Sequence, residues 1–424
     1  MPVSGLEDIW WGRARPSWPA AAALSAAEGL FRAGAALRGA LYDAGLVSAE
    51  RAGAPVLSIG NLVVGGSGKT PATLALAERL LRRGRRVAVL SRGYAARSRG
   101  ARVVSDGERV LLGADEAGDE PLLLARRLSG VAVLCGPRRA ELARRAVEEL
   151  QADALVLDDG FQHRSLRRDL DVVVVDAAAP EGNGRLLPRG PNREPWSALG
   201  RAHLAWISRS DQVSTAALAV LRARLASATG RPPVLARYAV REVLDGLLAR
   251  SFGPGALGGR RVVLLCALAR PEGFRRTLAD LGAEVVLERV FRDHHRFTEG
   301  ELEETLRAAE AAGCDAVATT EKDAVRLPTS VAAHSLWRVV RIEAEIVEGG
   351  EVLDDLIARA IGATPLPSPP PASGGREQNP STPTSTPTPT PTPTSTSTDE
   401  RARASTSPSP PPGERAGERG PHGG

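Results

Sequence analysis

A glycine-rich loop between an apolar run and a helical pattern constrains this chain most. Residues 65–70 read Gly-Gly-Ser-Gly-Lys-Thr, the run at 56–59 has the length of a buried strand, and residues 73–81 have helical periodicity. A strand, a loop of this composition and a helix, in this order, form a phosphate-binding loop, in which backbone N–H groups hold phosphate oxygens. The predicted nucleotide-binding residues are Gly65, Gly66, Ser67, Gly68, Lys69 and Thr70.

The lysine of this loop stands out because the chain has only two lysines, Lys69 and Lys322, against fifty-three arginines. A compact ammonium can fold back under a bound phosphate, whereas a planar guanidinium is too wide. The usual motif has a glycine five residues before Gly68, where this chain has Val63, so only its second half matches. A purely structural glycine-rich turn is the alternative. Because strand, loop and helix coincide, we expect the chain to bind a nucleoside triphosphate.

The hydrophobic pattern predicts an α/β fold. Its apolar runs are continuous rather than alternating, which indicates strands covered on both faces, hence a mainly parallel, P-loop NTPase-like sheet between helices. A second, smaller α/β domain follows a connection near residues 230–260. The predicted strands are 56–59, 87–90, 131–134, 154–157, 172–175 and 204–207, then 262–266, 285–287, 316–319 and 339–346, with later helices at 272–281 and 299–312.

The two ends of the chain differ from this core. A helix over residues 20–46 would carry one apolar face, but its charged residues argue against a membrane-spanning segment. It could lie in a membrane interface, with the nearby tryptophans at headgroup depth, or pack on the core. Residues 380–398 contain only Pro, Ser and Thr, which predicts a disordered tail. The predicted apolar face comprises Leu30, Ala33, Leu37 and Leu41. The predicted divisions are an amphipathic segment at 1–50, the P-loop core at 51–235, the smaller domain at 236–362 and the tail at 363–424.

Composition narrows the classes of partner. Three widely spaced cysteines suit neither a disulfide framework nor a zinc site, and they fit a reducing compartment. The net charge of +5 suggests an anionic partner. The sequence lacks the alternation of basic and aromatic residues that would indicate nucleic-acid binding. An anionic lipid or a phosphorylated substrate explains the charge as well.

Acidic residues supply two further motifs. The apolar run at 154–157 ends in Asp158 and Asp159, which in a P-loop protein would hold Mg²⁺ together with Thr70, although a plain strand-end turn is the alternative. Asp119 lies at the start of a predicted helix, where a helix cap is the simpler interpretation. His294 is followed by a second histidine, His295, but the side chains of adjacent residues diverge, which disfavours binding of one metal ion by both. A distant Asp and His could instead meet as a general base and its partner.

Arginines mark two loops. Arg92 follows the strand at 87–90, and the polar loop at 182–195 contains Arg185 and Arg193, the latter beside Glu194. Guanidinium groups suit a phosphate-bearing acceptor. A solvated surface loop is the alternative.

Taken together, these motifs resemble the tetraacyldisaccharide 4′-kinase family of lipid A biosynthesis. The resemblance runs in the family's order from about residue 41 to residue 360, and the family's loop also lacks the first glycine. The tail beyond residue 362 has no counterpart. Arg189 and Asn192 depart from the family pattern, in which Ala and Leu are common, and His295 stands where an aromatic residue is usual. The motifs that carry the resemblance are residues 60–71, 91–94, 118–121, 158–163, 185–195, 293–294 and 320–323.

The resemblance implies a kinase that transfers the ATP γ-phosphate to the 4′-hydroxyl of a tetraacyldisaccharide 1-phosphate, with Mg²⁺. It implies that Asp119 is the base, paired with His294, and that Lys69 serves the phosphates. We expect the first helix to associate peripherally with the cytoplasmic face of the inner membrane. We do not expect the chain to bind nucleic acid or to need an obligate protein partner. A P-loop ATPase that acts as a switch or metallochaperone, without a lipid acceptor, is the alternative. The implied metal-site residues are Thr70, Asp158 and Asp159, and the implied substrate contacts are Arg92, Arg185, Arg193 and Glu194.

Overall fold

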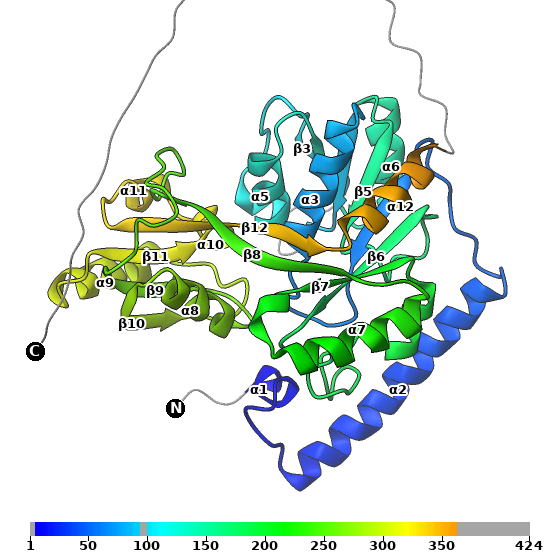
Figure 1. Ribbon diagram of the computed structural model, residues 1–424, viewed down its shortest axis with the longest axis horizontal. Helices are drawn as coiled ribbons and strands as arrows, with labels where there is room; N and C mark the ends of the chain where they lie inside the picture. The colour runs from blue at the N-terminus through cyan, green and yellow to red at the C-terminus, as the bar shows by residue number, and fades with distance from the viewer. Residues whose placement is uncertain (1–4, 94–99, 363–424) are drawn as a thin grey trace, which may run out of the picture. The chain divides into compact units, whose positions relative to one another are not determined.

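The computed structural model describes residues 5–93 and 100–362, which belong to one compact unit. Its centre is a twelve-stranded sheet in the order β10-β9-β11-β12-β8-β7-β6-β1-β5-β2-β4-β3 (Figure 1). Neighbouring strands are parallel except in the pairs β3–β4 and β8–β12. The predicted α/β class with a mainly parallel sheet is therefore confirmed.

The strands are β1 (Val56–Gly60), β2 (Val87–Ser91), β3 (Arg102–Ser105), β4 (Ala132–Cys135), β5 (Ala154–Asp158), β6 (Leu170–Asp176), β7 (Leu204–Ser208), β8 (Val234–Leu244), β9 (Arg261–Cys266), β10 (Glu284–Val290), β11 (Ala316–Thr320) and β12 (Trp337–Glu348). The α-helices are α1 (Leu6–Trp10), α2 (Trp18–Asp43), α3 (Lys69–Arg82), α4 (Ala114–Ala117), α5 (Asp119–Arg127), α6 (Arg139–Glu148), α7 (Thr215–Thr229), α8 (Pro271–Asp280), α9 (Glu299–Ala311), α10 (Glu321–Ala324), α11 (Thr329–Ala332) and α12 (Gly350–Gly362). Two short 3₁₀ helices, η1 (Trp196–Arg201) and η2 (Ser210–Gln212), flank β7. Each predicted strand overlaps an observed one, whereas β3 and β8 were not predicted.

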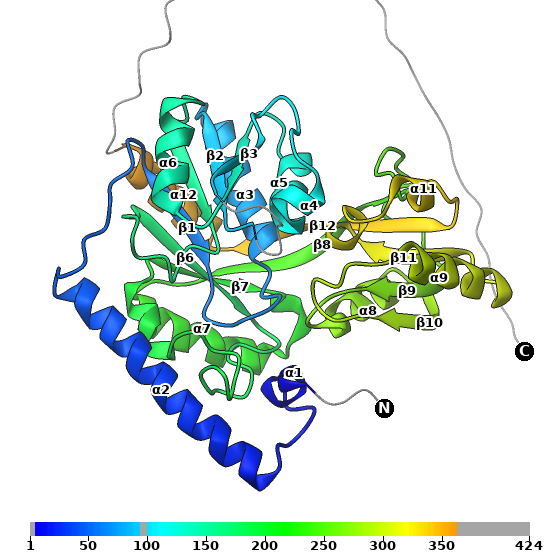
Figure 2. The ribbon, with the colours of Figure 1, turned by 180° about the vertical axis from the view of Figure 1, so that it is seen from behind.

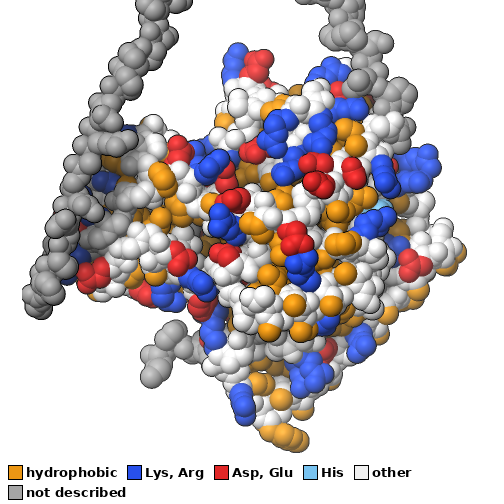
Figure 3. Space-filling model, in the orientation of Figure 1, with side chains coloured by type: hydrophobic (Ala, Val, Ile, Leu, Met, Phe, Trp, Pro, Cys, Tyr) orange, Lys and Arg blue, Asp and Glu red, His pale blue; other side chains and the backbone are white. Residues whose placement is uncertain are grey.

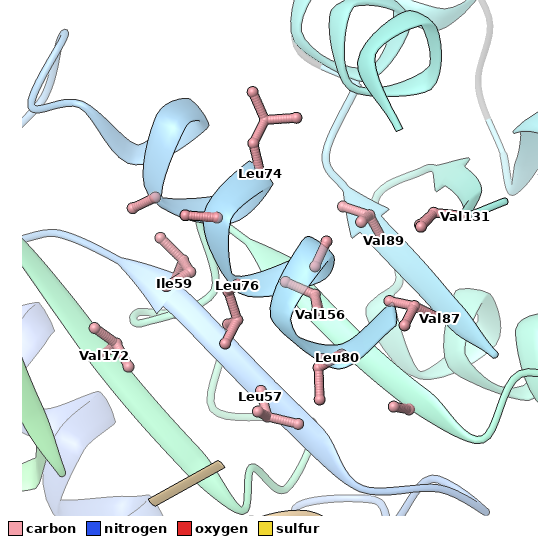
Figure 4. Close-up of a cluster of buried hydrophobic side chains, with 14 of the residues drawn as sticks. Leu57, Ile59, Leu74, Leu76, Leu80, Val87, Val89, Val131, Val156 and Val172 are labelled. Carbon is pink, nitrogen blue, oxygen red and sulfur yellow. The ribbon is translucent and has the colours of Figure 1, made fainter. Parts of the chain in front are cut away.

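The main hydrophobic core lies between α3 and the strands around β1. Leu76 and Leu80 of α3 meet Leu57 of β1 and Val156 of β5, as Figure 4 shows. Helices α5 and α12 contribute to this cluster, whereas α6 and α7 pack on clusters at the opposite face of the sheet (Figure 2). The strands are thus covered on both faces, as their continuous apolar runs predict.

The long antiparallel pair β8–β12 connects two groups of parallel strands. The middle of β8 is only partly buried, and ion pairs such as Arg237–Glu345 at 3.1 Å and Arg241–Glu343 at 2.9 Å flank it. On the far side, α8 and α9 each pack on a separate cluster around β9. The domain boundaries at 50, 235 and 362 stay predictions.

The N-terminal helix α2 has no buried residue. Within the part of the chain that the structure describes, no helix is long and apolar enough to span a bilayer. The predicted disordered tail at 363–424 lies outside the described residues.

Candidate active site

The phosphate-binding loop runs from the end of β1 to the start of α3. Gly68 adopts φ +90°, in the left-handed region that favours glycine, and α3 begins at Lys69. The Asn61 side-chain amide donates to Ser67 Oγ at 2.7 Å, and the Ser208 hydroxyl donates to the Ser67 carbonyl oxygen at 2.8 Å. Asn61, which follows β1, and Ser208, which ends β7, therefore both hold the loop at Ser67.

Asp158 and Asp159 stand at the end of β5, next to this loop because β1 and β5 are parallel neighbours. Asp158 is buried and accepts hydrogen bonds from Thr73 Oγ1 and Ser91 Oγ, both at 3.1 Å. Burial, with the nearby Glu120 and Asp159 carboxylates, raises the pKa of Asp158 to about 6. Negative charge is therefore crowded at this position.

The pKa of Asp159 is shifted in the opposite direction from that of Asp158. Its carboxylate lies 3.6 Å from Lys69 Nζ and accepts from Arg193 Nη1 at 2.7 Å and 2.9 Å. Burial alone would raise the pKa of Asp159, but the Lys69 and Arg193 cations outweigh it and hold the pKa below its usual range. Asp159 also adopts φ +56°, an uncommon conformation for a residue with a side chain.

Asp119 and His294 meet, although 175 residues separate them in the chain. His294 Nδ1 lies 3.1 Å from Asp119 Oδ2, and an Arg326 guanidinium nitrogen lies 3.5 Å from the same oxygen. Asp119 is buried and is the first residue of α5, whose N-cap is Gly118 without a side-chain cap bond. The carboxylate therefore faces His294 rather than capping its helix. His294 adopts φ +59°, and such outliers concentrate at functional sites.

Glu120 joins the Asp119–His294 pair to the nucleotide end. Its charge contributes to the raised pKa of Asp158, and its Oε1 lies 3.7 Å from Lys322 Nζ. Lys322 in turn donates to Asp293 Oδ1 at 3.2 Å. One polar cluster therefore contains the metal-site candidates and the base candidate.

The segment at 320–323 attaches this half of the site to α5. Glu321 accepts from Arg127 of α5 at 2.8 Å and from Arg341 of β12 at 2.7 Å. Asp323 is buried and pairs with Arg326, which contacts Asp119. The sequence motif contained these residues, but no spacing rule assigned them this role.

The arginine-rich loop lies partly at the site. Arg193 contacts Asp159, as described above, while Glu194 accepts from Arg201 at 2.8 Å. Arg185 and Arg92 are exposed. No comparison tests a substrate role for these four residues, so that role stays a prediction.

Two departures from the family pattern have structural explanations. Asn192 is buried, and its side-chain amide donates to the Glu181 and Arg185 carbonyl oxygens, both at 2.9 Å, which closes the loop. His295 stacks on Phe291 with 4.7 Å between ring centroids, and its Nε2 lies 3.1 Å from Glu301. The two adjacent histidines therefore face different partners.

Sequence reasoning missed a second support of the phosphate-binding loop. Arg209 donates to the Gly66 carbonyl oxygen at 3.3 Å and pairs with Asp176, which also pairs with Arg270. Trp11, from the segment after α1, lies beneath the Arg270 guanidinium at 5.2 Å. Asp176 ends β6 and Arg209 directly follows β7, so their positions at strand ends were the available signal.

Comparison with known proteins identifies the family. The model of the tetraacyldisaccharide-1-P 4′-kinase family matches residues 20–361. The chain belongs to this family. A tetraacyldisaccharide 4′-kinase from Anaeromyxobacter sp. (strain Fw109-5) is 66% identical over 363 residues, covering 85% of this chain and 96% of the relative. One from Pelobacter propionicus is 39% identical over 292 residues, covering 69% and 79%.

A solved structure agrees with this assignment. The crystal structure of LpxK from Aquifex aeolicus in complex with ATP has a TM-score of 0.64 and 30% sequence identity, covering 80% of this chain and 99% of that one. The resemblance derived from the motifs is thus confirmed at the level of the tetraacyldisaccharide-1-P 4′-kinase family.

Proposed function

We propose that this chain transfers the γ-phosphoryl group of ATP to the 4′-hydroxyl of a tetraacyldisaccharide 1-phosphate. The observation that carries the proposal is the Asp119–His294 pair, joined through Glu120 to the residues around the phosphate-binding loop. A switch ATPase needs a water-positioning group but no base for an alcohol acceptor. The names of the relatives and the ATP-bound structure of LpxK support the same activity.

In this reaction the acceptor oxygen forms a bond to the γ-phosphorus while the bond to the β,γ-bridging oxygen breaks, and ADP leaves. Asp119 would take the hydroxyl proton, and His294 would hold the Asp119 carboxylate in place. Lys69 and the loop amides would bind the β- and γ-phosphates. Such transfer depends on positioning and charge neutralisation, so the proposed reaction needs no covalent intermediate on these residues.

The residues near Asp158 fit Mg²⁺. Asp158 is a buried carboxylate crowded by Asp159 and Glu120, and Thr70 lies in the first turn of α3, the helix whose Thr73 donates to Asp158. Among residues 5–93 and 100–362, no group of three His, Cys, Asp or Glu side chains could hold a metal ion alone. Mg²⁺ usually binds one or two carboxylates plus substrate phosphates, so Thr70, Asp158 and Asp159 would share it with ATP. When bound, it would neutralise charge on the phosphates.

The acceptor would bind along the loop at 182–195. Arg185 is exposed there and free to reach solvent, and Arg193 and Glu194 lie where the loop approaches Asp159. Arg92 follows β2 on the same edge of the sheet. We propose that these side chains contact the sugar and the 1-phosphate, for which guanidinium groups are well suited.

We also propose that α2 binds a membrane surface, at the cytoplasmic face of the inner membrane. Its charged residues on the protein side make contacts: Glu28 accepts from the Leu186 amide at 2.9 Å, and Asp43 pairs with Arg164 at 2.6 Å. The opposite face is apolar and exposed, the reverse of a helix packed on a core. Figure 3 shows orange side chains along the outer edge of α2, at the lower right. The exposed apolar positions at helical spacing are Ala22, Ala26, Leu30, Ala33, Leu37 and Ala40.

Glu28 also connects this helix to the acceptor loop. Besides the Leu186 amide, it lies 3.7 Å from the Arg189 guanidinium. A lipid substrate that remains in the bilayer would therefore meet the loop directly beside the membrane-bound helix. This arrangement also gives Arg189, a departure from the family pattern, a structural partner.

The direct test of the function uses γ-labelled ATP, Mg²⁺ and a detergent-dispersed tetraacyldisaccharide 1-phosphate. We expect label in the lipid, and a rate lower by at least about 100-fold in Lys69→Ala, because the ammonium that holds the phosphates is gone. Label released only as inorganic phosphate, with or without lipid, would establish the ATPase alternative instead.

Membrane binding is tested by replacing Leu30 and Leu37 with Glu. Their side chains are 79% and 63% exposed, so the fold should be unaffected. Losing two inserted leucines should lower the partition coefficient on phospholipid vesicles by on the order of 100-fold. Sedimentation with vesicles measures it, and Val220→Glu on α7, where Val220 is 63% exposed, is the matched control. Equal binding of the double variant and the control would contradict the proposal.

A further inference from the structure

Both lysines of this arginine-rich chain lie at the candidate active site. Lys69 belongs to the phosphate-binding loop, and Lys322 lies on α10 beside His294. The Lys322 ammonium is 3.4 Å from His294 Nε2 and 3.2 Å from Asp293 Oδ1. The proposed reaction gives Lys69 a task but leaves Lys322 without one.

The hydrogen-bonding capacity of the two side chains fixes which nitrogen of His294 carries a proton. An ammonium has three donors and no acceptor, so a bond to Lys322 requires an unprotonated His294 Nε2. A neutral imidazole then carries its proton on Nδ1, the nitrogen 3.1 Å from Asp119 Oδ2. In the other tautomer, which carries its proton on Nε2, the N–H group would point at the ammonium. The Asp293 Oδ2 atom lies 3.9 Å from Nε2, too far to accept a hydrogen bond from it.

We propose that Lys322 is a positioning residue that holds His294 in the Nδ1–H tautomer, so that the imidazole donates to Asp119. The effect on proton acceptance by Asp119 rests on the proposed kinase function, whereas the tautomer of His294 does not. With Nε2 committed to the ammonium, the ring stays neutral and leaves the full negative charge on Asp119. An imidazolium at the same place would weaken Asp119 as a proton acceptor.

The surroundings keep the Lys322 ammonium charged and in place. Burial alone would lower the pKa of Lys322, but the Glu120 and Asp293 carboxylates outweigh it and raise the pKa. Glu120 belongs to α5, which also carries Asp119, and Asp293 precedes His294. The ammonium thus bonds the two segments whose side chains must meet. Two further charged groups act here: the Asp323 carboxylate also raises the pKa of Lys322, and Arg326 contacts Asp119 and pairs with Asp323.

The positive φ of His294 is consistent with this arrangement. Residues with a side chain rarely adopt φ +59° unless surrounding contacts hold them there. Contacts at both ring nitrogens, to Asp119 and to Lys322, supply such constraints. A compact ammonium on a flexible stem fits between two carboxylates and a ring nitrogen better than a planar guanidinium does.

Nitrogen NMR of the full-length protein, labelled with ¹⁵N in its histidine rings, tests the tautomer without any substrate. The His294→Gln variant identifies the His294 signals by their loss. In the wild type we expect a protonated Nδ1 and an unprotonated Nε2. In Lys322→Met we expect protonated Nε2 to appear, because the ammonium no longer occupies that side. A protonated Nε2 in the wild type overturns the proposal, whether or not Lys322→Met folds. Unchanged His294 signals in a folded Lys322→Met protein overturn it as well.

Kinetics separate positioning from a purely structural role. Lys322→Met should lower kcat by roughly 10- to 100-fold while KM for ATP changes by less than about threefold, because only proton acceptance by Asp119 suffers. Arg289→Met removes a half-exposed cation, paired with Glu304, from the same part of the fold and is the matched control. An unchanged kcat would overturn the effect on Asp119. A wild type that transfers no label would instead refute the kinase function and leave the tautomer result valid.

Discussion

The Asp119→Asn variant should transfer phosphate to the lipid acceptor about 1,000-fold more slowly than the wild type, with an ATP affinity within about twofold. The asparagine keeps the shape of the side chain and an oxygen that accepts from His294, so the fold and the contact at 3.1 Å should persist. What it loses is the ability to take the proton of the acceptor hydroxyl. Single-turnover transfer of labelled phosphate measures the rate, and equilibrium nucleotide binding measures the affinity.

A matched control comes from the preceding short helix. Asp115 lies in the first turn of α4, is exposed, and pairs with Arg296, so Asp115→Asn alters an acid of similar helical position outside the site. Its transfer rate should stay within about twofold of the wild type. If Asp119→Asn retains more than about a tenth of the wild-type rate, Asp119 is not the base.

The nucleotide end of the site was predictable because its residues belong to one local unit. Gly65–Thr70 lies between a strand and a helix, and the sequence shows all three parts in succession. Asp158 and Asp159 were predicted from a second pattern, an apolar strand that ends in carboxylates, which in P-loop proteins hold Mg²⁺. The structure places Asp159 3.6 Å from Lys69 Nζ, because β1 and β5 are parallel neighbours.

The rest of the site depends on contacts between distant segments, which spacing cannot reveal. Nothing in the sequence brings Asp119 within reach of His294, 175 residues away; only the family resemblance paired them. Thr73 reaches Asp158 because α3 begins at Lys69 and so places Thr73 on its inner side. Lys322 was notable as one of two lysines and as part of the motif at 320–323, but its bond to His294 emerged only from the fold.

Strand β8 shows where the hydrophobic signal itself fails. Its ends are buried, but its middle carries Arg237 and Arg241, which pair with glutamates of β12. A strand stabilised partly by cross-strand ion pairs does not produce a continuous apolar run. The sequence therefore indicated only a connection near residues 230–260. This unrecognised strand also carries Tyr238, a neighbour of the phosphate-binding loop.

The Gly68→Ala variant should lose detectable ATP binding and transfer phosphate at least about 1,000-fold more slowly, because its backbone and its surroundings both require glycine. Gly68 adopts φ +90°, and a Cβ there would overlap the Tyr238 hydroxyl and lie 3.3 Å from Ser208 Cβ. Tyr238 cannot yield easily, since its ring lies 5.2 Å beneath the Arg209 guanidinium, which bonds the same loop at Gly66. The loop must therefore leave the conformation that presents its amides to phosphate.

Titration with a fluorescent ATP analogue measures this loss, and thermal unfolding shows whether the rest of the protein stays folded. The control is Gly29→Ala in α2, where nothing lies within 4 Å of the added carbon and φ is ordinary. That change should leave nucleotide affinity within about twofold, since an alanine suits a helix better than glycine does. Adding Tyr238→Ala to Gly68→Ala removes the overlap but not the unfavourable φ. Nucleotide binding should then recover only in part, and full recovery would show that the clash, rather than the backbone conformation, makes glycine necessary here.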